Sequence, residues 1–278
     1  ESLFGDGETI ARKIKREIWE ELSLRASAGV APNKFTAKLA SDLDKPDGLL
    51  VVPAARVRAF LAVLPIERMW GVGARTAPHA HEAGIHTIGD LADADDARLA
   101  HVFGERGPFM GALARGEDDR HVVPDREAKS IGAENTFEQD VTSRTALTRH
   151  LLEQSVRVAS RMHVAELATT TVVLKLKFHD FKLITRSIKL PSPVRDTDAI
   201  YAAAIALLDR VELRGKRIRL TGVSATGLVP KTSTRTLFPD EKRQRSERLE
   251  DVAATLRARF GDDAIVRARL LDAKRREP

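Results

Sequence analysis

The sequence predicts an α+β protein with more than one domain, on three observations. Residues 25–52 give strand, helix and strand signals in turn. Residues 54–118 fit short helices separated by glycines, and residues 129–223 switch between the two-residue period of strands and the longer period of helices. With 278 residues, 42% of them hydrophobic and 31% charged, the chain is long enough to bury several cores.

Composition excludes several classes of protein. There is no cysteine, so disulfides and thiolate metal sites are excluded. No apolar run could span a membrane and no signal peptide is recognisable, so we expect a cytoplasmic protein. Because the chain begins with Glu1 rather than Met, we expect a fragment, a processed form or a truncated chain.

Positive charge is concentrated in one part of the chain. The formal net charge is +6, and residues 129–223 hold 16 Lys and Arg against 10 Asp and Glu. The whole excess therefore lies in this region, which indicates an anionic partner for it.

Residues 1–53 are expected to form an α/β piece. A helix from Glu8 to Leu22 comes first, and one face of it is expected to be buried because apolar residues recur every four positions: Ile10, Ile14, Ile18 and Leu22. A strand over 25–30, a helix over 34–43 and a strand over 49–52 follow.

The turn Lys45-Pro46-Asp47-Gly48 joins the second helix to the second strand. A lysine and backbone N–H groups beside a helix end can hold an anionic group. On local chemistry alone, a solvated surface turn is the alternative, because short motifs produce many false matches.

Residues 54–118 contain Gly71-Val72-Gly73 between predicted helices, followed by Gly84 to Leu91. This is the pattern of a helix-hairpin-helix, in which the glycines let backbone N–H groups approach a phosphate while the apolar residue packs inward. A plain helix–helix turn is the alternative.

Residues 119–128 are predicted to be a linker, within a polar stretch that starts at Glu117. The acidic pair Asp118-Asp119 is expected to be solvated. Residues 231–278 form a tail whose helix ends at Gly261 and is expected to turn its apolar residues inward: Leu249, Val252, Ala253, Leu256 and Phe260.

Residues 129–230 predict a ferredoxin-like β-α-β-β-α-β domain. Both helices would cover one sheet face, leaving the other to mainly basic, non-aromatic residues: Lys175, Lys177, Thr185, Ser187, Lys189, Arg217 and Arg219. On the last strand, Ile218 and Leu220 are expected inward and Thr221 outward. Arg186 has the parity of the inward residues, which requires a bulge or a snorkelling side chain. Such a face favours a phosphate backbone over base stacking, and a merely solvated face is the alternative.

Residues 26–48, ASAGVAPNKFTAKLASDLDKPDG, closely resemble the conserved palm segment of Y-family translesion DNA polymerases, the bacterial DNA polymerase IV group in particular. The resemblance implies that Lys45 contacts the triphosphate of an incoming nucleotide. It also implies that residues 1–53 are the C-terminal part of a palm, 54–118 a helix-hairpin-helix thumb and 129–230 a little finger.

The resemblance extends to DNA contacts and to the tail. It implies that a set of little-finger residues lies along the DNA backbone: Lys129, Ser130, Thr185, Arg186, Ser187 and Arg219. Leu237-Phe238 stands where the family often carries a sliding-clamp peptide, although Thr234 replaces the expected glutamine. The implied partners are primer–template DNA and a deoxynucleoside triphosphate, with a sliding clamp as a further candidate, for a monomeric protein.

The family synthesises DNA past damaged bases with two metal ions, and the resemblance implies Mg²⁺ for the complete enzyme. It places the metal-binding carboxylates upstream of Glu1, so we expect no catalytic residue in this chain and no activity from it alone. A DNA-binding relative that lost its active site, and a helix-hairpin-helix DNA repair protein, are the alternatives.

Overall fold

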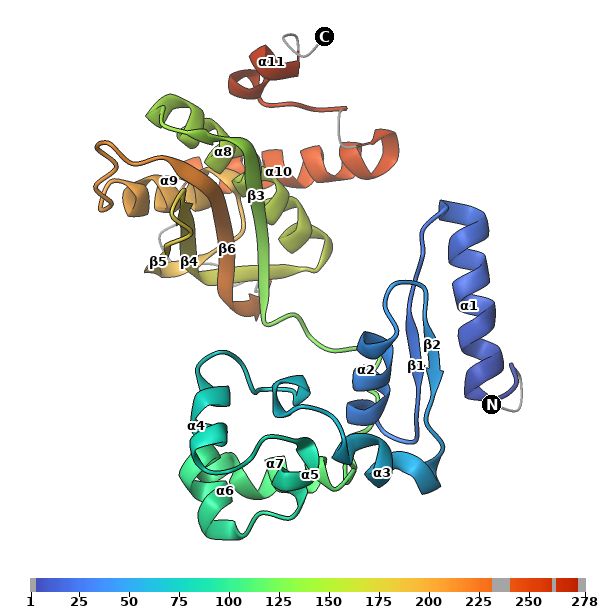
Figure 1. Ribbon diagram of the computed structural model, residues 1–278. Helices are drawn as coiled ribbons and strands as arrows, with labels where there is room; N and C mark the ends of the chain where they lie inside the picture. Colours follow the sequence, from blue (N-terminus) through green and yellow to red (C-terminus); the bar gives the residue numbers. More distant parts are fainter. Residues whose placement is uncertain (1–3, 232–240, 262–263, 275–278) are drawn as a thin grey trace. The chain divides into compact units, whose positions relative to one another are not determined.

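The structure is a computed structural model that describes residues 4–231, 241–261 and 264–274 (Figure 1). It divides into two compact units, an N-terminal unit (Glu1–Asp125) and a C-terminal unit (Arg126–Pro278). The division falls inside residues 119–128, the segment that the sequence predicts as a linker. Each unit has its own hydrophobic core. The mixture of helices with an antiparallel sheet confirms the predicted α+β class.

The N-terminal unit begins with helix α1 (Gly7–Leu22), strand β1 (Ala28–Val30), helix α2 (Lys34–Leu43) and strand β2 (Leu49–Val51). The two strands pair in parallel, as expected for strands joined by a helix. The bounds of α2 confirm the helix predicted over 34–43. Asn33 caps it, because the Asn33 side chain accepts a hydrogen bond from the Thr36 backbone N–H.

Close packing of β1 against α2 depends on Gly29. A Cβ atom built at Gly29 would lie 2.1 Å from the Ala37 carbonyl oxygen and 2.4 Å from the Ser41 backbone nitrogen. No side chain fits that space, so glycine is what lets the helix lie directly on the strand.

The predicted buried face of α1 is wrong for this structure. No residue of α1 is buried, and Ile14, Trp19 and Leu22 are about half exposed or more. The reason is size: α1 is about 24 Å long, whereas the neighbouring strands have three residues each and span about 10 Å. So small a sheet cannot cover the apolar stripe.

Short helices complete the N-terminal unit. They are η1 (Ala54–Arg56), α3 (Val57–Ala62), η2 (Ile66–Arg68), α4 (Thr76–Glu82), α5 (Ile88–Ala92), α6 (Asp96–Phe103), η3 (Gly104–Arg106) and α7 (Gly107–Ala114). One core joins them to α2, since Phe35 and Leu39 belong to the same buried cluster as Leu61, Met69 and Met110.

The C-terminal unit has the predicted order of elements: β3 (Ser130–Val141), α8 (Arg144–Val164), β4 (Leu167–Phe178), β5 (Leu183–Val194), α9 (Thr197–Leu208) and β6 (Ile218–Pro230). Its antiparallel sheet has the order β3-β6-β4-β5. Each strand–helix–strand unit is therefore split by one intervening strand. The first strand lies at an edge and the last strand lies inside the sheet.

Both helices pack on the same face of this sheet (Figure 1). Val172, Leu174 and Leu176 of β4 are buried in the core beneath them. The intervening residues Lys175 and Lys177 must point the other way, because successive side chains of a strand alternate between faces. We call the face directed away from α8 and α9 the outer face.

The predicted facing of β6 is wrong after Ile218, because the register with β4 shifts between Lys177 and Phe178. Leu220 lies opposite Lys177 and therefore shares the outer face. Thr221 points inward instead, is fully buried and accepts a hydrogen bond from Gln154 Nε2 at 2.9 Å.

The tail forms α10 (Glu241–Phe260) and α11 (Ala268–Lys274). The prediction that α10 turns its apolar side inward is wrong: Leu249, Val252 and Phe260 are exposed, whereas Glu250 and Arg257 are buried. Polar groups at the start of α9 explain this orientation. The Thr197 backbone N–H donates to Glu250 Oε2 at 3.4 Å, Arg195 pairs with Asp251, and Arg257 lies 3.5 Å from Glu250. Within the described ranges, no helix is long and apolar enough to cross a membrane.

Gly29→Ala is expected to destabilise the N-terminal unit by about 3 kcal/mol, because the added methyl group overpacks the β1–α2 contact. Both tryptophans of the chain, Trp19 and Trp70, lie in this unit, so urea unfolding followed by tryptophan fluorescence measures it selectively. Gly73→Ala is the matched control, since its Cβ would meet nothing within 4 Å. Equal unfolding midpoints for the two variants would contradict the packing argument.

Candidate functional site

Lys45 lies in the turn after α2 and contacts an acidic side chain of that helix. Its Nζ is 2.6 Å from Asp42 Oδ1, and Lys38 also binds the Asp42 carboxylate. Hydrogen bonds from Lys38 and then Lys45 lower the pKa of Asp42 to about 2. Two ammonium groups therefore share one carboxylate that stays ionised at neutral pH, and the cluster keeps a net positive charge.

The turn itself is fixed from the side of α1. Lys15 Nζ donates to the backbone oxygens of Asp47 and Gly48 at 2.7 and 3.1 Å, and to Asp47 Oδ1 at 2.8 Å. Arg25 binds the other carboxylate oxygen of Asp47 at 2.5 Å. Lys15, and after it Arg25, lowers the pKa of Asp47. These contacts hold the backbone of the turn and do not involve Lys45.

The backbone of the turn offers less to an anion than the sequence suggests. Pro46 has no N–H group, and the Gly48 N–H already donates to Ser27 Oγ at 3.1 Å. The Lys45 side chain, more than half exposed, is a group of this turn that can reach a bound anion.

The Gly71-Val72-Gly73 segment has the local geometry of a tight turn. Gly71 has φ +92°, Val72 is buried, and the Gly73 carbonyl accepts from the N–H groups of Thr76 and Ala77 at the start of α4. Space around the Gly73 Cβ position is open. The preceding element is the short 3₁₀ helix η2 rather than an α-helix.

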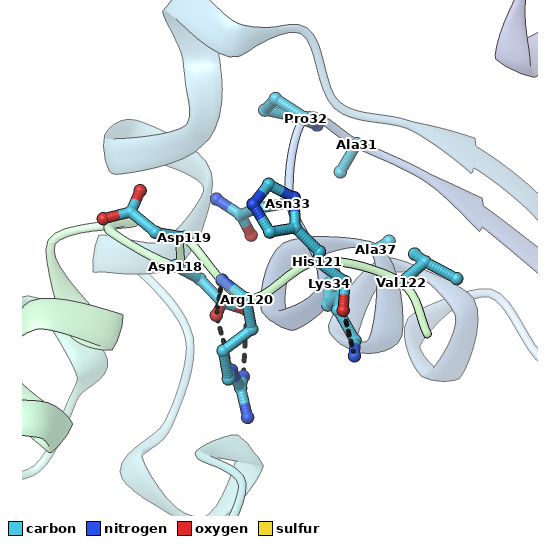
Figure 2. Close-up of a pocket in the computed structure, with 10 residues that line it drawn as sticks. All are labelled: Ala31, Pro32, Asn33, Lys34, Ala37, Asp118, Asp119, Arg120, His121 and Val122. Atoms are coloured by element: carbon cyan, nitrogen blue, oxygen red, sulfur yellow. Dashed lines mark hydrogen bonds and ion pairs between the residues drawn. The ribbon is translucent and has the colours of Figure 1, made fainter. Parts of the chain in front are cut away.

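A cavity of about 510 Å³ lies beside the start of α2 in the N-terminal unit (Figure 2). Ten residues line it: Ala31, Pro32, Asn33, Lys34, Ala37, Asp118, Asp119, Arg120, His121 and Val122. Figure 2 shows the segment after α7 crossing the first turn of α2. Asn33 Nδ2 donates to the Gly116 carbonyl at 2.8 Å, and Lys34 Nζ donates to the His121 carbonyl at 3.1 Å.

Asp118 corrects the prediction that the acidic pair is solvated. Its side chain is 1% exposed, and Oδ2 accepts a hydrogen bond from the Phe35 backbone N–H at 2.9 Å. Arg120 forms a two-pronged ion pair with it at 2.5 and 2.9 Å, which is the main cause of the lowered pKa of Asp118. Asp118 thus satisfies a free N–H group at the start of α2, and only Asp119 is exposed.

Arg120 also ties this segment to the helices of the same unit. Its guanidinium carbon lies 5.5 Å from the ring centre of Trp70 and 5.3 Å from that of Phe109. The polar groups around the cavity are therefore largely used within the chain. This arrangement fixes the segment after α7 rather than forming an open binding site.

On the outer face of the C-terminal unit, the sheet register brings polar and basic residues together. Lys175 lies opposite Thr185, Val173 opposite Ser187, and Thr171 opposite Lys189. Lys175 Nζ reaches Glu134 Oε2 at 2.7 Å across Gly222, which has no side chain to block it.

Three further basic residues surround the end of this sheet. Arg217 and Arg219 lie 3.9 and 4.0 Å from the carboxylate of Asp140. Arg186 lies opposite Leu174 with no register shift nearby, so it has core parity on an edge strand. It is exposed and its Nη1 donates to the Thr185 carbonyl at 2.9 Å, so the snorkelling alternative holds and the bulge alternative does not.

The remaining predicted site residues lie at the start of β3 or outside the described part. Lys129 directly precedes β3, and Ser130 begins that strand opposite Thr226; both are exposed. Leu237 and Phe238 fall outside the described residues. In the described part of the chain, no group of three or more His, Cys, Asp or Glu side chains could hold a metal ion.

Comparison with known sequences assigns the chain to a family. Residues 1–42 match the impB/mucB/samB family, and residues 128–237 match the impB/mucB/samB family C-terminal domain. Together with the fold, these matches show that the chain belongs to the Y-family DNA polymerases, within the impB/mucB/samB family. The curated relatives to which it is similar carry the name DNA polymerase IV.

Two of these relatives define the extent of the similarity. DNA polymerase IV of Alkalilimnicola ehrlichii is 43% identical over 240 residues, which cover 86% of this chain and 66% of that protein. DNA polymerase IV of Desulfatibacillum aliphaticivorans is 45% identical over 227 residues, which cover 82% of this chain and 57% of that protein. The chain thus spans somewhat less than two thirds of the length of these relatives.

Solved structures agree with this assignment. A Y-family DNA polymerase chimera of Dbh and Dpo4 matches with a TM-score of 0.66 and 25% identity, covering 82% of this chain and 65% of that chain. An insertion ternary complex of Dbh DNA polymerase matches with a TM-score of 0.51 and 24% identity, over 82% and 65% of the two chains, and supports the fold alone.

Asp118→Ala is expected to destabilise the N-terminal unit by about 2 kcal/mol, because it leaves the Phe35 N–H and the Arg120 guanidinium without their buried partner. Hydrogen exchange at the Phe35 amide should accelerate by about 30-fold accordingly. Asp119→Ala removes the neighbouring, exposed carboxylate and should change stability by less than about 0.5 kcal/mol. Similar exchange rates in the two variants would refute the role assigned to Asp118.

Proposed function

We propose that the complete protein is a DNA polymerase of the DNA polymerase IV type, which copies DNA past damaged bases. Membership of the Y family and the names of the curated relatives support this activity. The observation in this chain that carries the proposal is the outer face, where Lys175, Lys177 and Lys189 lie among small polar residues and a few apolar ones. The cations of such a face can contact the phosphates of a nucleic-acid backbone.

DNA is proposed to bind along the outer face without sequence preference, through residues at its strands and ends: Lys129, Ser130, Lys175, Lys177, Thr185, Arg186, Ser187, Arg217 and Arg219. The net charge of +6 is concentrated in residues 129–223, the part of the chain that contains this face, which supports a polyanionic partner. Arg186 would contribute from the edge strand, since its guanidinium lies outside the core.

Lys45 is proposed to contact the triphosphate of the incoming nucleotide. Its side chain is exposed, and its partner Asp42 is itself an anion. A phosphate oxygen could replace the carboxylate oxygen without leaving a buried charge unpaired, so the exchange has a low desolvation penalty.

Within this proposal, residues 1–53 belong to the palm, 54–118 to a helix-hairpin-helix thumb, 119–128 to a linker, 129–230 to the little finger and 231–278 to a tail. Gly71, Val72 and Gly73 would bring the thumb against the DNA backbone. The buried Val72 and the open surroundings of Gly73 support that role. A sliding clamp is a further proposed partner, supported by the Leu237-Phe238 pair.

Mg²⁺ is the metal expected for the complete enzyme, where it would stabilise the charge that develops on the triphosphate. The described residues do not fit such a site, since none of their carboxylates form a suitable cluster. A DNA-binding relative without an active site is the second candidate, because the outer face serves binding whether or not synthesis follows.

DNA binding by the outer face is tested with two charge reversals that change the net charge equally. Lys189→Glu lies on the outer face, whereas Arg157→Glu lies exposed on α8. In anisotropy titrations with a fluorescent primer–template, the affinity should fall steeply with salt, and Lys189→Glu should lower it about tenfold. Arg157→Glu should change it by less than about twofold. Equal losses, or a flat salt dependence, would contradict binding by this face.

Lys45→Ala in the complete protein is expected to raise the apparent KM for nucleotide about tenfold, because one charge-assisted contact to the triphosphate is lost. Single-nucleotide incorporation measures this, and primer–template affinity should stay unchanged. Lys13→Ala on the exposed side of α1 is the control, since Lys13 pairs only with Glu17 at 3.7 Å among the described contacts. An unchanged KM for nucleotide in Lys45→Ala would contradict the proposed contact between Lys45 and the triphosphate.

A further inference from the structure

Phe181 is an exposed aromatic residue at the turn between β4 and β5. Its exposed fraction is 60%, and it has no part in the buried core of the C-terminal unit. Hydrogen bonds close the turn around it, from the Phe181 N–H to the Phe178 carbonyl at 3.0 Å and from the Phe178 N–H to the Lys182 carbonyl at 2.9 Å. The ring is therefore presented to solvent by a well-defined backbone.

Two basic side chains of the outer face lie against this one ring. Lys177 Nζ is 4.8 Å from the ring centre, and the guanidinium carbon of Arg219 is 4.9 Å from it. Lys177 comes from the end of β4 and Arg219 from the start of β6, neighbouring strands whose register shifts at this point. The ring thus brings together two cations that would otherwise repel each other.

The backbone of Phe181 is strained for a residue of its size. Its φ is +64°, in the left-handed region that favours glycine and asparagine and is rare for bulky side chains. Core packing does not explain the phenylalanine, because the side chain is exposed. A strained, exposed aromatic residue beside two cations is the kind of outlier from which a functional role can be inferred.

Another basic residue of this face, Lys175, has a different kind of partner, a carboxylate. Lys175 is paired with Glu134 at 2.7 Å, so its charge is neutralised locally. An aromatic ring instead attracts a cation through its quadrupole and leaves the positive charge in place. Lys177 and Arg219 consequently lie beside the ring while both remain able to bind an anion. Arg219 also lies 4.0 Å from the Asp140 carboxylate, which it shares with Arg217 at 3.9 Å.

We propose that Phe181 is a positioning residue that holds Lys177 and Arg219 side by side as one binding site for the phosphodiester backbone of DNA. This inference rests on the proposed DNA binding by the outer face. It identifies the part of that face where two basic side chains are positioned before DNA binds. In this proposal the ring acts by positioning the two cations, 4.8 and 4.9 Å from its centre, rather than by stacking on a base.

The test compares three substitutions of Phe181 by anisotropy titration with a fluorescent primer–template and by thermal unfolding. Phe181→Gly and Phe181→Asn remove the ring and suit a φ of +64°, so the melting temperature should stay the same or rise. DNA affinity should nevertheless fall about fivefold in both variants. Phe181→Tyr keeps the ring and should bind within about twofold of the unmodified protein. A merely structural role would instead make affinity follow stability.

A double-mutant cycle separates positioning from direct contact. In the background of Lys177→Ala with Arg219→Ala, the loss caused by Phe181→Gly should disappear, because nothing remains for the ring to position. An equal loss in that background would overturn the proposal in favour of direct stacking. Steep salt-dependent binding by the unmodified protein with no loss in Phe181→Gly would overturn this inference alone. An unmodified protein that does not bind DNA would overturn it together with the proposed function.

Discussion

The alternation of side chains along β4 is the constraint on which the rest of the C-terminal unit depends. This strand pairs with β5 on one side and β6 on the other, and its apolar residues Val172, Leu174 and Leu176 fill the core under α8 and α9. Lys175 and Lys177 are interleaved with them, so they must lie on the outer face. A slip of one residue would bury both ammonium groups, so the hydrophobic core and the basic surface are fixed by the same register.

Patterns that depend on neighbours in the sequence were predictable. The bounds of α2 are those predicted from the sequence, and the order of the six elements of the C-terminal unit follows from changes of period alone. The facing of β6 was not predictable beyond Ile218. A register shift exists only between paired strands, so a single-strand pattern that assigns Leu220 inward and Thr221 outward misses it.

Contacts between residues distant in the sequence explain the other differences. The Phe35 N–H that Asp118 binds lies 83 residues earlier in the chain, so the neighbouring sequence does not show that Asp118 is buried at the start of α2. On α10 the apolar period is genuine, yet Glu250 turns inward because the Thr197 N–H at the start of α9 is its partner, and Arg257 turns inward beside Glu250. Polar complementarity across an interface outweighs the amphipathic pattern there, since a buried polar group without a partner costs about 1–3 kcal/mol.

The two lysines central to the proposed function are held in physically different ways. Asp42 holds Lys45 with an opposite charge, which an incoming anion must displace and which returns when the anion leaves. Phe181 holds Lys177 without neutralising it, so an anion can bind with no partner to displace. The first arrangement suits a ligand that exchanges in every catalytic cycle. The second suits a polymer gripped continuously, because the cation stays in place whether or not a particular phosphate is present.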